Sequence, residues 1–150
     1  MAERILAVIP VKTGIQSKKS KTEGAFIIAL SGDLGAGKTT FVQGFARGLG
    51  IKKRATSPTF IIFRRFAIPK VESHKSKVES LYHVDAYRIK KSADLTALGF
   101  KEILKDPKNI VLIEWPENIK KILPKTVFWV RFKHGRRELE RSLTFSKDLL

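Results

Sequence analysis

Two uninterrupted apolar runs dominate the pattern of hydrophobic and polar positions along the chain. Ala25 to Leu30 form one run, between Gly24 and Gly32, and Ile110 to Ile113 form another, after Asn109. Apolar runs of this length without alternation are typical of strands that are buried on both faces of a sheet. We therefore expect both runs to be central strands.

A helix is expected shortly after the first run. Phe41, Phe45 and Leu49 recur at every fourth position, which places them on one face of a helix. Gly50 is a typical residue for the end of such a helix. The pattern thus predicts a buried strand, a turn and an amphipathic helix in succession.

Shorter patterns predict the remaining elements. Strands are expected at 60–66, 81–85, 127–132 and 142–145, and helical segments at 92–105, interrupted near Gly99, and after Pro116. The first two of these strands are expected to pair as a hairpin, and the last two as a C-terminal hairpin that turns near His134. The order of elements indicates an α/β fold with a mixed, mainly parallel sheet flanked by helices. Ligands of such sheets bind beyond the C-terminal ends of the parallel strands.

The turn between the first strand and its helix carries the most informative motif. Gly32 to Thr39 read GDLGAGKT, which fits the phosphate-loop pattern G-x-x-x-x-G-K-[ST]. The glycines would let successive backbone N–H groups point at an anion. Lys38 would reach and neutralise the outer phosphates, and the Thr39 hydroxyl would hold a magnesium ion. The residues expected to bind the phosphates of a nucleoside triphosphate are Gly35, Ala36, Gly37, Lys38, Thr39 and Thr40.

Length and composition fit one domain and exclude several classes of site. The 150 residues are 43% hydrophobic, enough for one core, and contain no cysteine, which excludes disulfides and thiolate metal sites. No apolar run approaches the roughly 20 residues that span a membrane. Residues 1–23 are rich in Lys and Ser and are expected to form a mobile N-terminal segment, while 24–150 form the domain. A soluble, cytoplasmic protein is expected.

The chain is strongly basic, with 30 Lys and Arg against 14 Asp and Glu and a net charge of +16. A positive field of this size favours polyanions such as nucleic acid, or an acidic protein surface. A solvated surface whose charge serves solubility explains the same number. One phosphate site does not need sixteen surplus charges, so the composition leaves both interpretations open.

Three further residues are candidates to complete a magnesium–nucleotide site. Glu114 ends the second apolar run, where an acid can hold the metal shell or polarise the attacking water, unless it only forms a surface ion pair. Asp85 ends the strand expected at 81–85 and is either a metal ligand or a turn residue. Thr59 precedes the strand expected at 60–66, where its hydroxyl would sense the outermost phosphate or belong to an ordinary turn. His83 is interpreted as a packed strand residue, and Trp115 as either core or partner surface.

Five short motifs in this order resemble the TsaE family, formerly YjeE, of bacterial P-loop ATPases. They are SGDLGAGKTT at 31–40, SPTF at 57–60, YHVDAYR at 82–88, LGF at 98–100 and IEWPE at 113–117. The resemblance covers about residues 24–145. It implies a P-loop NTPase-like fold and a role, together with the TsaD and TsaB proteins, in installing the threonylcarbamoyl group on the adenosine beside the anticodon of tRNA.

The resemblance also implies roles for particular residues. The cofactors would be ATP and Mg²⁺, with Lys38 and Thr39 at the phosphates and the metal, Thr59 in a switch-like loop and Asp85 at the metal. Glu114 stands where the family has a functionally important acid and would be both a metal ligand and a catalytic residue. Hydrolysis is expected to be slow without partners. Direct or indirect contact of the basic surface with tRNA is left open.

Two features depart from the family pattern, and two other functions compete with it. Residues 1–24 lack the helix that usually helps to enclose the nucleotide base, and the connection at 67–80 is longer and more basic than expected. A small-molecule kinase would need an Arg-rich lid and an acceptor pocket, for which the chain after Glu114 has little room. A nucleic-acid-binding module would not need the intact Lys38 and Thr39.

Overall fold

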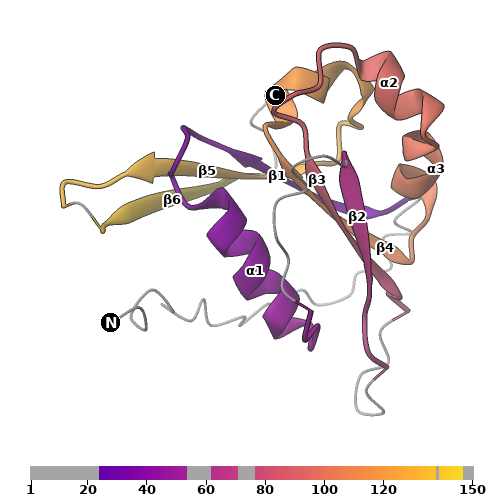
Figure 1. The fold of residues 1–150 in the computed structure, drawn as a ribbon, viewed down its shortest axis with the longest axis horizontal. Helices are drawn as coiled ribbons and strands as arrows, with labels where there is room; N and C mark the ends of the chain where they lie inside the picture. Colours follow the sequence, from indigo (N-terminus) through magenta and orange to yellow (C-terminus); the bar gives the residue numbers. More distant parts are fainter. Residues whose placement is uncertain (1–23, 54–61, 71–76, 138, 147–150) are drawn as a thin grey trace.

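The computed structural model describes residues 24–53, 62–70, 77–137 and 139–146, which form an α/β domain around a six-stranded sheet (Figure 1). The expectation for 1–23 lies outside the described residues. The elements in chain order are β1 (Phe26–Ser31), α1 (Lys38–Gly48), β2 (Phe63–Ala67), β3 (Ser80–Asp85), α2 (Ser92–Ala97), α3 (Phe100–Lys105), β4 (Asn109–Glu114), the 3₁₀ helix η1 (Pro116–Ile122), β5 (Phe128–His134) and β6 (Arg141–Ser146).

The strands are arranged in the order β2-β3-β4-β1-β5-β6. Neighbouring strands from β3 to β5 run parallel, while β2 and β6 pair antiparallel at the two edges. This confirms the mixed, mainly parallel sheet and both expected hairpins. Because β1 and β4 are central, each is covered on both faces, as their uninterrupted apolar sequences require.

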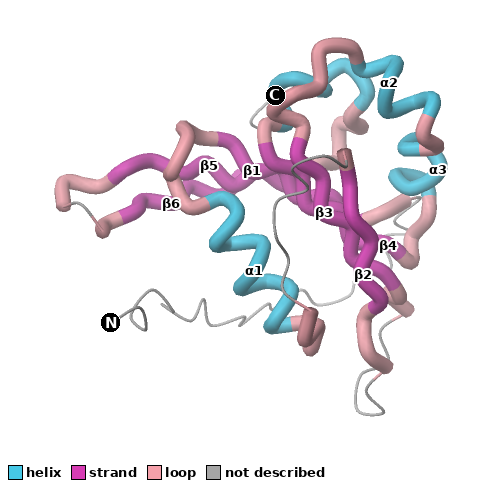
Figure 2. Tube along the Cα trace, viewed as in Figure 1, coloured by secondary structure: helices cyan, strands magenta, loops and turns pink. Residues whose placement is uncertain are grey.

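Helices cover the two faces of the sheet separately, with α1 on one side and α2, α3 and η1 on the other (Figure 2). Side chains alternate along each strand, so neighbouring residues enter different cores. Ile28 and Leu30 of β1 join the core under α1, whereas Ile27 and Ala29 join the core under α2 and α3. The fold therefore has two apolar layers separated by one sheet.

Glycines in the left-handed region set the ends of the helices. Gly37 has φ 100° immediately before α1, and Gly50 has φ 78° just after its last turn. Gly99, with φ 74°, separates α2 from α3, which confirms the expected interruption at that position. Other residues adopt these conformations only with strain, so glycine is the residue best suited to these helix ends.

The first hairpin is longer than expected at the end away from the site. β2 begins at Phe63, Ile62 O accepts from Asp85 N at 3.2 Å, and residues 60 and 61 lie outside the described residues. The strand continues to Ala67, and pairing extends further because Ile68 N donates to Glu79 O at 2.9 Å. Part of the connection expected at 67–80 is thus an extension of the hairpin.

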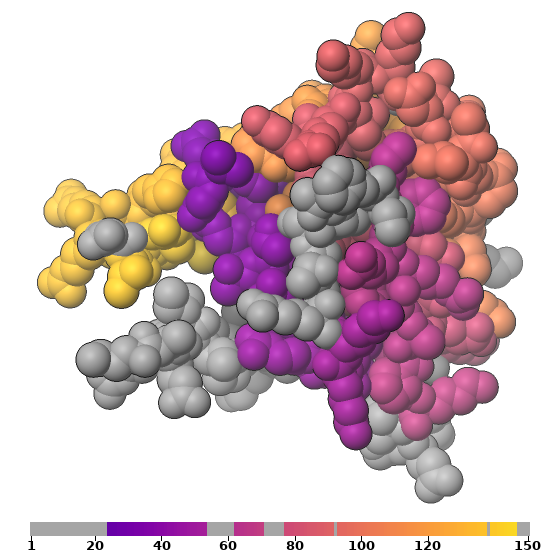
Figure 3. Space-filling model, in the orientation of Figure 1, coloured from indigo at the N-terminus to yellow at the C-terminus, as the bar shows by residue number. Residues whose placement is uncertain are grey.

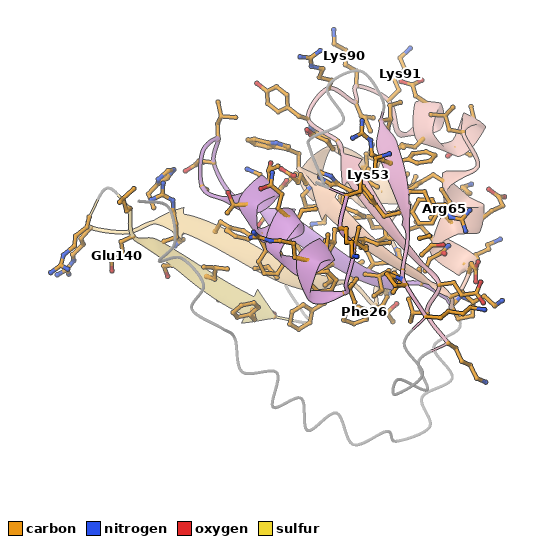
Figure 4. All side chains as sticks on the ribbon, turned by 60° about the horizontal axis from the view of Figure 1, so that its bottom comes forward. Phe26, Lys53, Arg65, Lys90, Lys91 and Glu140 are labelled. Carbon is orange, nitrogen blue, oxygen red and sulfur yellow. The ribbon has the colours of Figure 1, made fainter. Side chains whose placement is uncertain are left out.

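The second hairpin, β5–β6, projects from the rest of the domain (Figures 1 and 3). Glu140 lies at its outer end (Figure 4). Only its base is close to the buried strands, since Val130 and Phe132 enter the core under α1. Among the described residues, no helix has the length and apolar character needed to cross a membrane.

Candidate phosphate-binding and catalytic site

The phosphate loop lies at the C-terminal end of β1 and leads directly into α1. Gly32 has φ 136°, and a Cβ atom there would lie 2.5 Å from the carbonyl oxygen of Phe132 in β5. Gly35 and Gly37 have φ 74° and 100°. Glycine is therefore required at Gly32 for both conformation and space, and its neighbours curl the loop around the first turn of α1.

Lys38 is held inside the loop that it belongs to. Its side chain is 4% exposed, and its Nζ donates to Gly32 O at 2.6 Å and to Asp33 O at 2.8 Å. The same ammonium lies 4.0 Å from the centre of the Trp115 ring, a cation–π distance. Burial lowers the pKa of Lys38 below its ordinary value of 10.5, and nearby carboxylates, Glu114 first, oppose that shift.

The two predicted acids come from the ends of neighbouring parallel strands. Asp85 of β3 and Glu114 of β4 are direct partners in the register of the sheet. Partners in register point to the same face, which here is the face covered by α1. The structure thus brings both acids to the start of α1.

Glu114 makes polar contacts with both the phosphate-loop side and the sheet side of the site. Its side chain is almost fully buried and accepts the Thr39 hydroxyl at 3.0 Å on Oε1 and 2.9 Å on Oε2. His83 Nε2 lies 2.8 Å from the same Oε1. Glu114 is therefore not a surface ion pair but a buried carboxylate that contacts the phosphate loop.

Asp85 is more open and is held by its own turn. Its Oδ1 accepts the backbone N–H of Tyr87 at 3.1 Å. Asn118 in η1 donates to the carbonyls of Ala86 and Tyr87 at 2.9 Å and 3.3 Å, which ties this turn to the next element. Asp85 thus holds a turn through its side chain and also lines the cleft beside the phosphate loop.

Trp115 forms a wall of the site in an unusual backbone conformation. Among the described residues it is the one non-glycine residue with positive φ, at 58°. Its ring packs 5.0 Å from that of Tyr87 and covers Lys38 on another side. Strain of this kind costs about 1–3 kcal/mol and is concentrated at functional sites. The structure places Trp115 beside the phosphate loop, partly packed against the core and partly facing the site.

These residues surround one cleft of about 250 Å³, which is lined by Leu34, Gly35, Gly37, Lys38, Thr39, Thr40, Asp85, Tyr87, Glu114 and Trp115. Most predicted phosphate-binding residues are in this set. Ala36 is the exception, because its side chain is buried in the core under α1 and its N–H donates to Asp33 O at 3.2 Å. Thr59 lies outside the described residues.

The donor set of the cleft fits magnesium. A hydroxyl and two carboxylates are hard oxygen donors of the kind that Mg²⁺ prefers, and a nucleotide supplies the remaining ligands. Within the described part of the chain, no three His, Cys, Asp or Glu side chains form a metal cluster of their own. The residues therefore suit an ion that arrives with phosphates rather than one in an all-protein cage.

Comparisons with known proteins identify the family of the chain. The sequence model described as "Threonylcarbamoyl adenosine biosynthesis protein TsaE" matches residues 10–143. The chain belongs to the TsaE family. The TsaE protein of Bacillus subtilis is 37% identical to this chain, over 80% of this chain and 68% of its own length. The TsaE protein of Borreliella burgdorferi is 38% identical, over 71% of this chain and 72% of its own length.

A solved structure supports the same assignment. The crystal structure of YdiB from Bacillus subtilis superposes with a TM-score of 0.61 at 32% identity, covering 81% of this chain and 68% of that one. The P-loop NTPase-like α/β fold expected from the motif is thereby confirmed.

One contact in this TsaE-family site was missed from the sequence. His83 was interpreted as a packed strand residue, and it is fully buried, but its ring also contacts Glu114. A signal was present, because His83 and Asp85 are two residues apart on one strand and therefore share a face. The neighbour across the sheet could not be read from the sequence, since it depends on the register of β3 with β4.

Proposed function

We propose that this TsaE-family protein is a Mg²⁺-dependent ATPase that serves the biosynthesis of threonylcarbamoyladenosine in tRNA. The observation that carries the proposal is the bond from Thr39 at the start of α1 to Glu114 at the end of β4, next to the buried Lys38. Phosphate-binding backbone, a cation and an acid meet in one cleft. The family supplies the biological process in which this chemistry is used.

Phosphate binding follows from the loop and the first turn of α1. The N–H groups at the start of a helix have no partner within the helix and carry a partial positive charge, which attracts anions. Lys38 would exchange the carbonyls of Gly32 and Asp33 for phosphate oxygens. Its low exposure strengthens that interaction, because little water competes for the charge.

Thr39, Asp85 and Glu114 would hold the magnesium ion, which neutralises charge on the phosphate oxygens. Glu114 would keep the Thr39 hydroxyl oriented, because the hydroxyl donates its proton to the carboxylate and retains its lone pairs for a metal ion. Glu114 can also orient the water that attacks the terminal phosphorus atom. Thr59 as a sensor of that phosphate stays a prediction.

Hydrolysis by the chain alone is expected to be slow. Arg141 Nη2 lies 3.4 Å from Gly35 O, and among the described residues no arginine lines the cleft. A cation at the transferred phosphoryl group can raise turnover by several orders of magnitude. Activation by the TsaD and TsaB proteins is therefore part of the proposal. A small-molecule kinase is less well supported, because the described chain after β4 consists mainly of η1 and the projecting β5–β6 hairpin.

The first test is calorimetric titration of the protein with ATP in the presence of Mg²⁺. We expect binding by the unaltered chain and a loss of at least about tenfold in affinity for Lys38→Ala, since a charge-assisted phosphate contact is removed. Lys101→Ala is the control, because Lys101 is exposed on α3 across the sheet. Absence of binding by the unaltered protein would exclude the nucleotide site.

The second test adds purified TsaD, TsaB and substrate tRNA. We expect ATP hydrolysis to accelerate and tRNA modification to proceed through many turnovers only when the protein and ATP are both present. Lys38→Ala should support neither effect. Modification that proceeds equally without the protein would contradict the proposed role.

Direct contact with tRNA is tested separately by a salt series. Lys90 and Lys91 after β3, Lys53 after α1 and Arg65 on β2 are exposed basic residues (Figure 4). Binding through phosphate contacts weakens steeply with salt, by a slope that counts the contacts. A slope near zero would mean that tRNA is reached only through the partner proteins.

A further inference from the structure

His83 is buried more completely than either acid of the site. Its side chain has no exposed area, and its Nε2 lies 2.8 Å from Glu114 Oε1. Its Nδ1 is also buried and has no hydrogen-bond partner among the described residues. An unsatisfied buried nitrogen is costly and rare, so a histidine that only fills the core is a poor choice at this position.

The contact with the Glu114 carboxylate determines which nitrogen of the His83 ring donates. A carboxylate can only accept hydrogen bonds, so the 2.8 Å contact requires a proton on Nε2. A second proton on Nδ1 would be a buried donor with no acceptor among the described residues. The neutral ring with its proton on Nε2 is therefore the form that fits the site.

The Glu114 carboxylate is contacted from two sides. Thr39 reaches Oε1 at 3.0 Å and Oε2 at 2.9 Å, and His83 reaches Oε1 at 2.8 Å. A glutamate side chain has three rotatable bonds, and Thr39 alone would have to fix it from the loop side. His83 fixes it from the sheet side, because β3 is rigidly paired to β4.

We propose that His83 is the positioning residue of the ATPase site: in its Nε2–H form it anchors Glu114 through Oε1 and thereby holds the carboxylate in place at the cleft. The inference rests on the proposed function, since Glu114 there orients the Thr39 hydroxyl and the attacking water. It adds the reason why a histidine stands two residues before Asp85 on the same face of β3.

The first experiment examines the chain without nucleotide. A two-bond ¹H–¹⁵N spectrum of the imidazole groups distinguishes the Nε2–H from the Nδ1–H form, and the chain has 3 histidines, so loss of one pattern in His83→Gln assigns the signal. We expect the Nε2–H pattern for His83 and its disturbance in Glu114→Gln. An Nδ1–H pattern would overturn the proposal, because Nε2 could not then donate to Glu114.

The second experiment compares two substitutions of similar size. His83→Leu removes the donor, whereas the amide nitrogen of His83→Gln can replace Nε2 as donor. For His83→Leu we expect kcat for ATP to fall about tenfold or more, which corresponds to about 1.4 kcal/mol, with KM changed less than about twofold. His83→Gln should recover most of kcat. Leu81→Val, two residues earlier on the same face, is the control for general loosening of β3.

Four outcomes distinguish the possibilities. Equal kcat for the Leu and Gln variants would overturn the proposal, as would an additional loss when His83→Leu is combined with Glu114→Gln, because the histidine would then act independently of the acid. Non-additive effects of the two substitutions would support it. Absence of ATP binding by the unaltered protein would remove the proposed function itself and leave only the His83–Glu114 contact, which the spectrum tests independently.

Discussion

The two faces of the central sheet are built from the same strands but end differently. Under α2 and α3, alternate strand residues form an apolar layer that includes Val84, Ile113 and Trp129. Under α1, the layer is equally apolar at Leu81 and Leu112, but its end nearest the phosphate loop is polar. The buried charged side chains of the described chain, Lys38 and Glu114, both lie there, together with His83.

The difference shows how one sheet separates stability from chemistry. An apolar layer needs only volume and shape, and it fixes the strands that hold the acids. The polar end of the other layer places charges where water is scarce, which strengthens them but destabilises the fold unless each is paired. The contacts among Thr39, Glu114 and His83 provide that pairing before any nucleotide is bound.

The largest effect is expected from Phe100, which is fully buried at the start of α3. Phe100→Ala removes a large side chain from the layer under α2 and α3 and leaves a cavity. We expect the free energy of unfolding to fall by about 3–5 kcal/mol in a chemical denaturation experiment. The affinity of the remaining folded protein for ATP should be nearly unchanged, because the cavity lies across the sheet from the cleft.

Phe145→Ala is the matched control for this substitution. Phe145 lies on β6 of the projecting hairpin and is 46% exposed, so its removal should cost clearly less than that of Phe100. A loss of ATP affinity in Phe100→Ala as large as its loss of stability would show that the two faces are not separate. In that case the apolar layer would itself shape the site.

The elements of the fold could be predicted from the sequence more completely than the polar site. The strands and α1 carry local signals: continuous apolar runs at β1 and β4, a four-residue repeat in α1, and glycine at its end. The phosphate loop was identified because its function depends on consecutive residues whose spacing is fixed by the backbone. These features need no knowledge of which strand lies beside which.

The rest of the site depends on contacts between distant segments. The bond from Thr39 to Glu114 joins residues 75 apart, and the contact of His83 with Glu114 joins residues 31 apart. The first depends on the register of β1 with β4 and the second on the register of β3 with β4. A one-residue shift in register would turn the acids to the other face. Motifs could therefore nominate Asp85 and Glu114, but only the packed sheet shows that they meet at α1.

An intermediate effect is expected from the glycine that opens the phosphate loop. In Gly32→Ala, the new Cβ would lie 2.5 Å from Phe132 O at a φ of 136°. The backbone must then shift, and we expect a loss of about 1–3 kcal/mol in stability together with weaker ATP binding. Thermal denaturation and calorimetry measure the two effects in one preparation.

Gly44→Ala provides the opposite case within the same helix–loop unit. A Cβ at Gly44 would meet nothing within 4 Å, and the residue lies inside α1. Alanine should raise stability by about 0.4–1 kcal/mol and leave ATP affinity unchanged, because it restricts only the unfolded chain. If Gly32→Ala is as harmless as Gly44→Ala, the close approach of the loop to β5 does not constrain the site.

The smallest expected effect is a change in tryptophan fluorescence when ATP binds. The two tryptophans lie on different faces of the sheet, so each reports on its own face. Trp115 lies at the cleft under the Lys38 ammonium, and Trp129 is 4% exposed in the layer under α2 and α3. The cation–π contact of this buried ammonium is worth about 2 kcal/mol. Nucleotide phosphates can still draw Lys38 away from the ring, because they offer it charge-assisted hydrogen bonds. We expect ATP to change the fluorescence of Trp129→Phe, which retains Trp115, and to leave that of Trp115→Phe unchanged. A fluorescence change in both variants would mean that nucleotide binding also alters the apolar layer around Trp129. No change in Trp129→Phe would mean that Lys38 keeps its position over Trp115 when ATP binds.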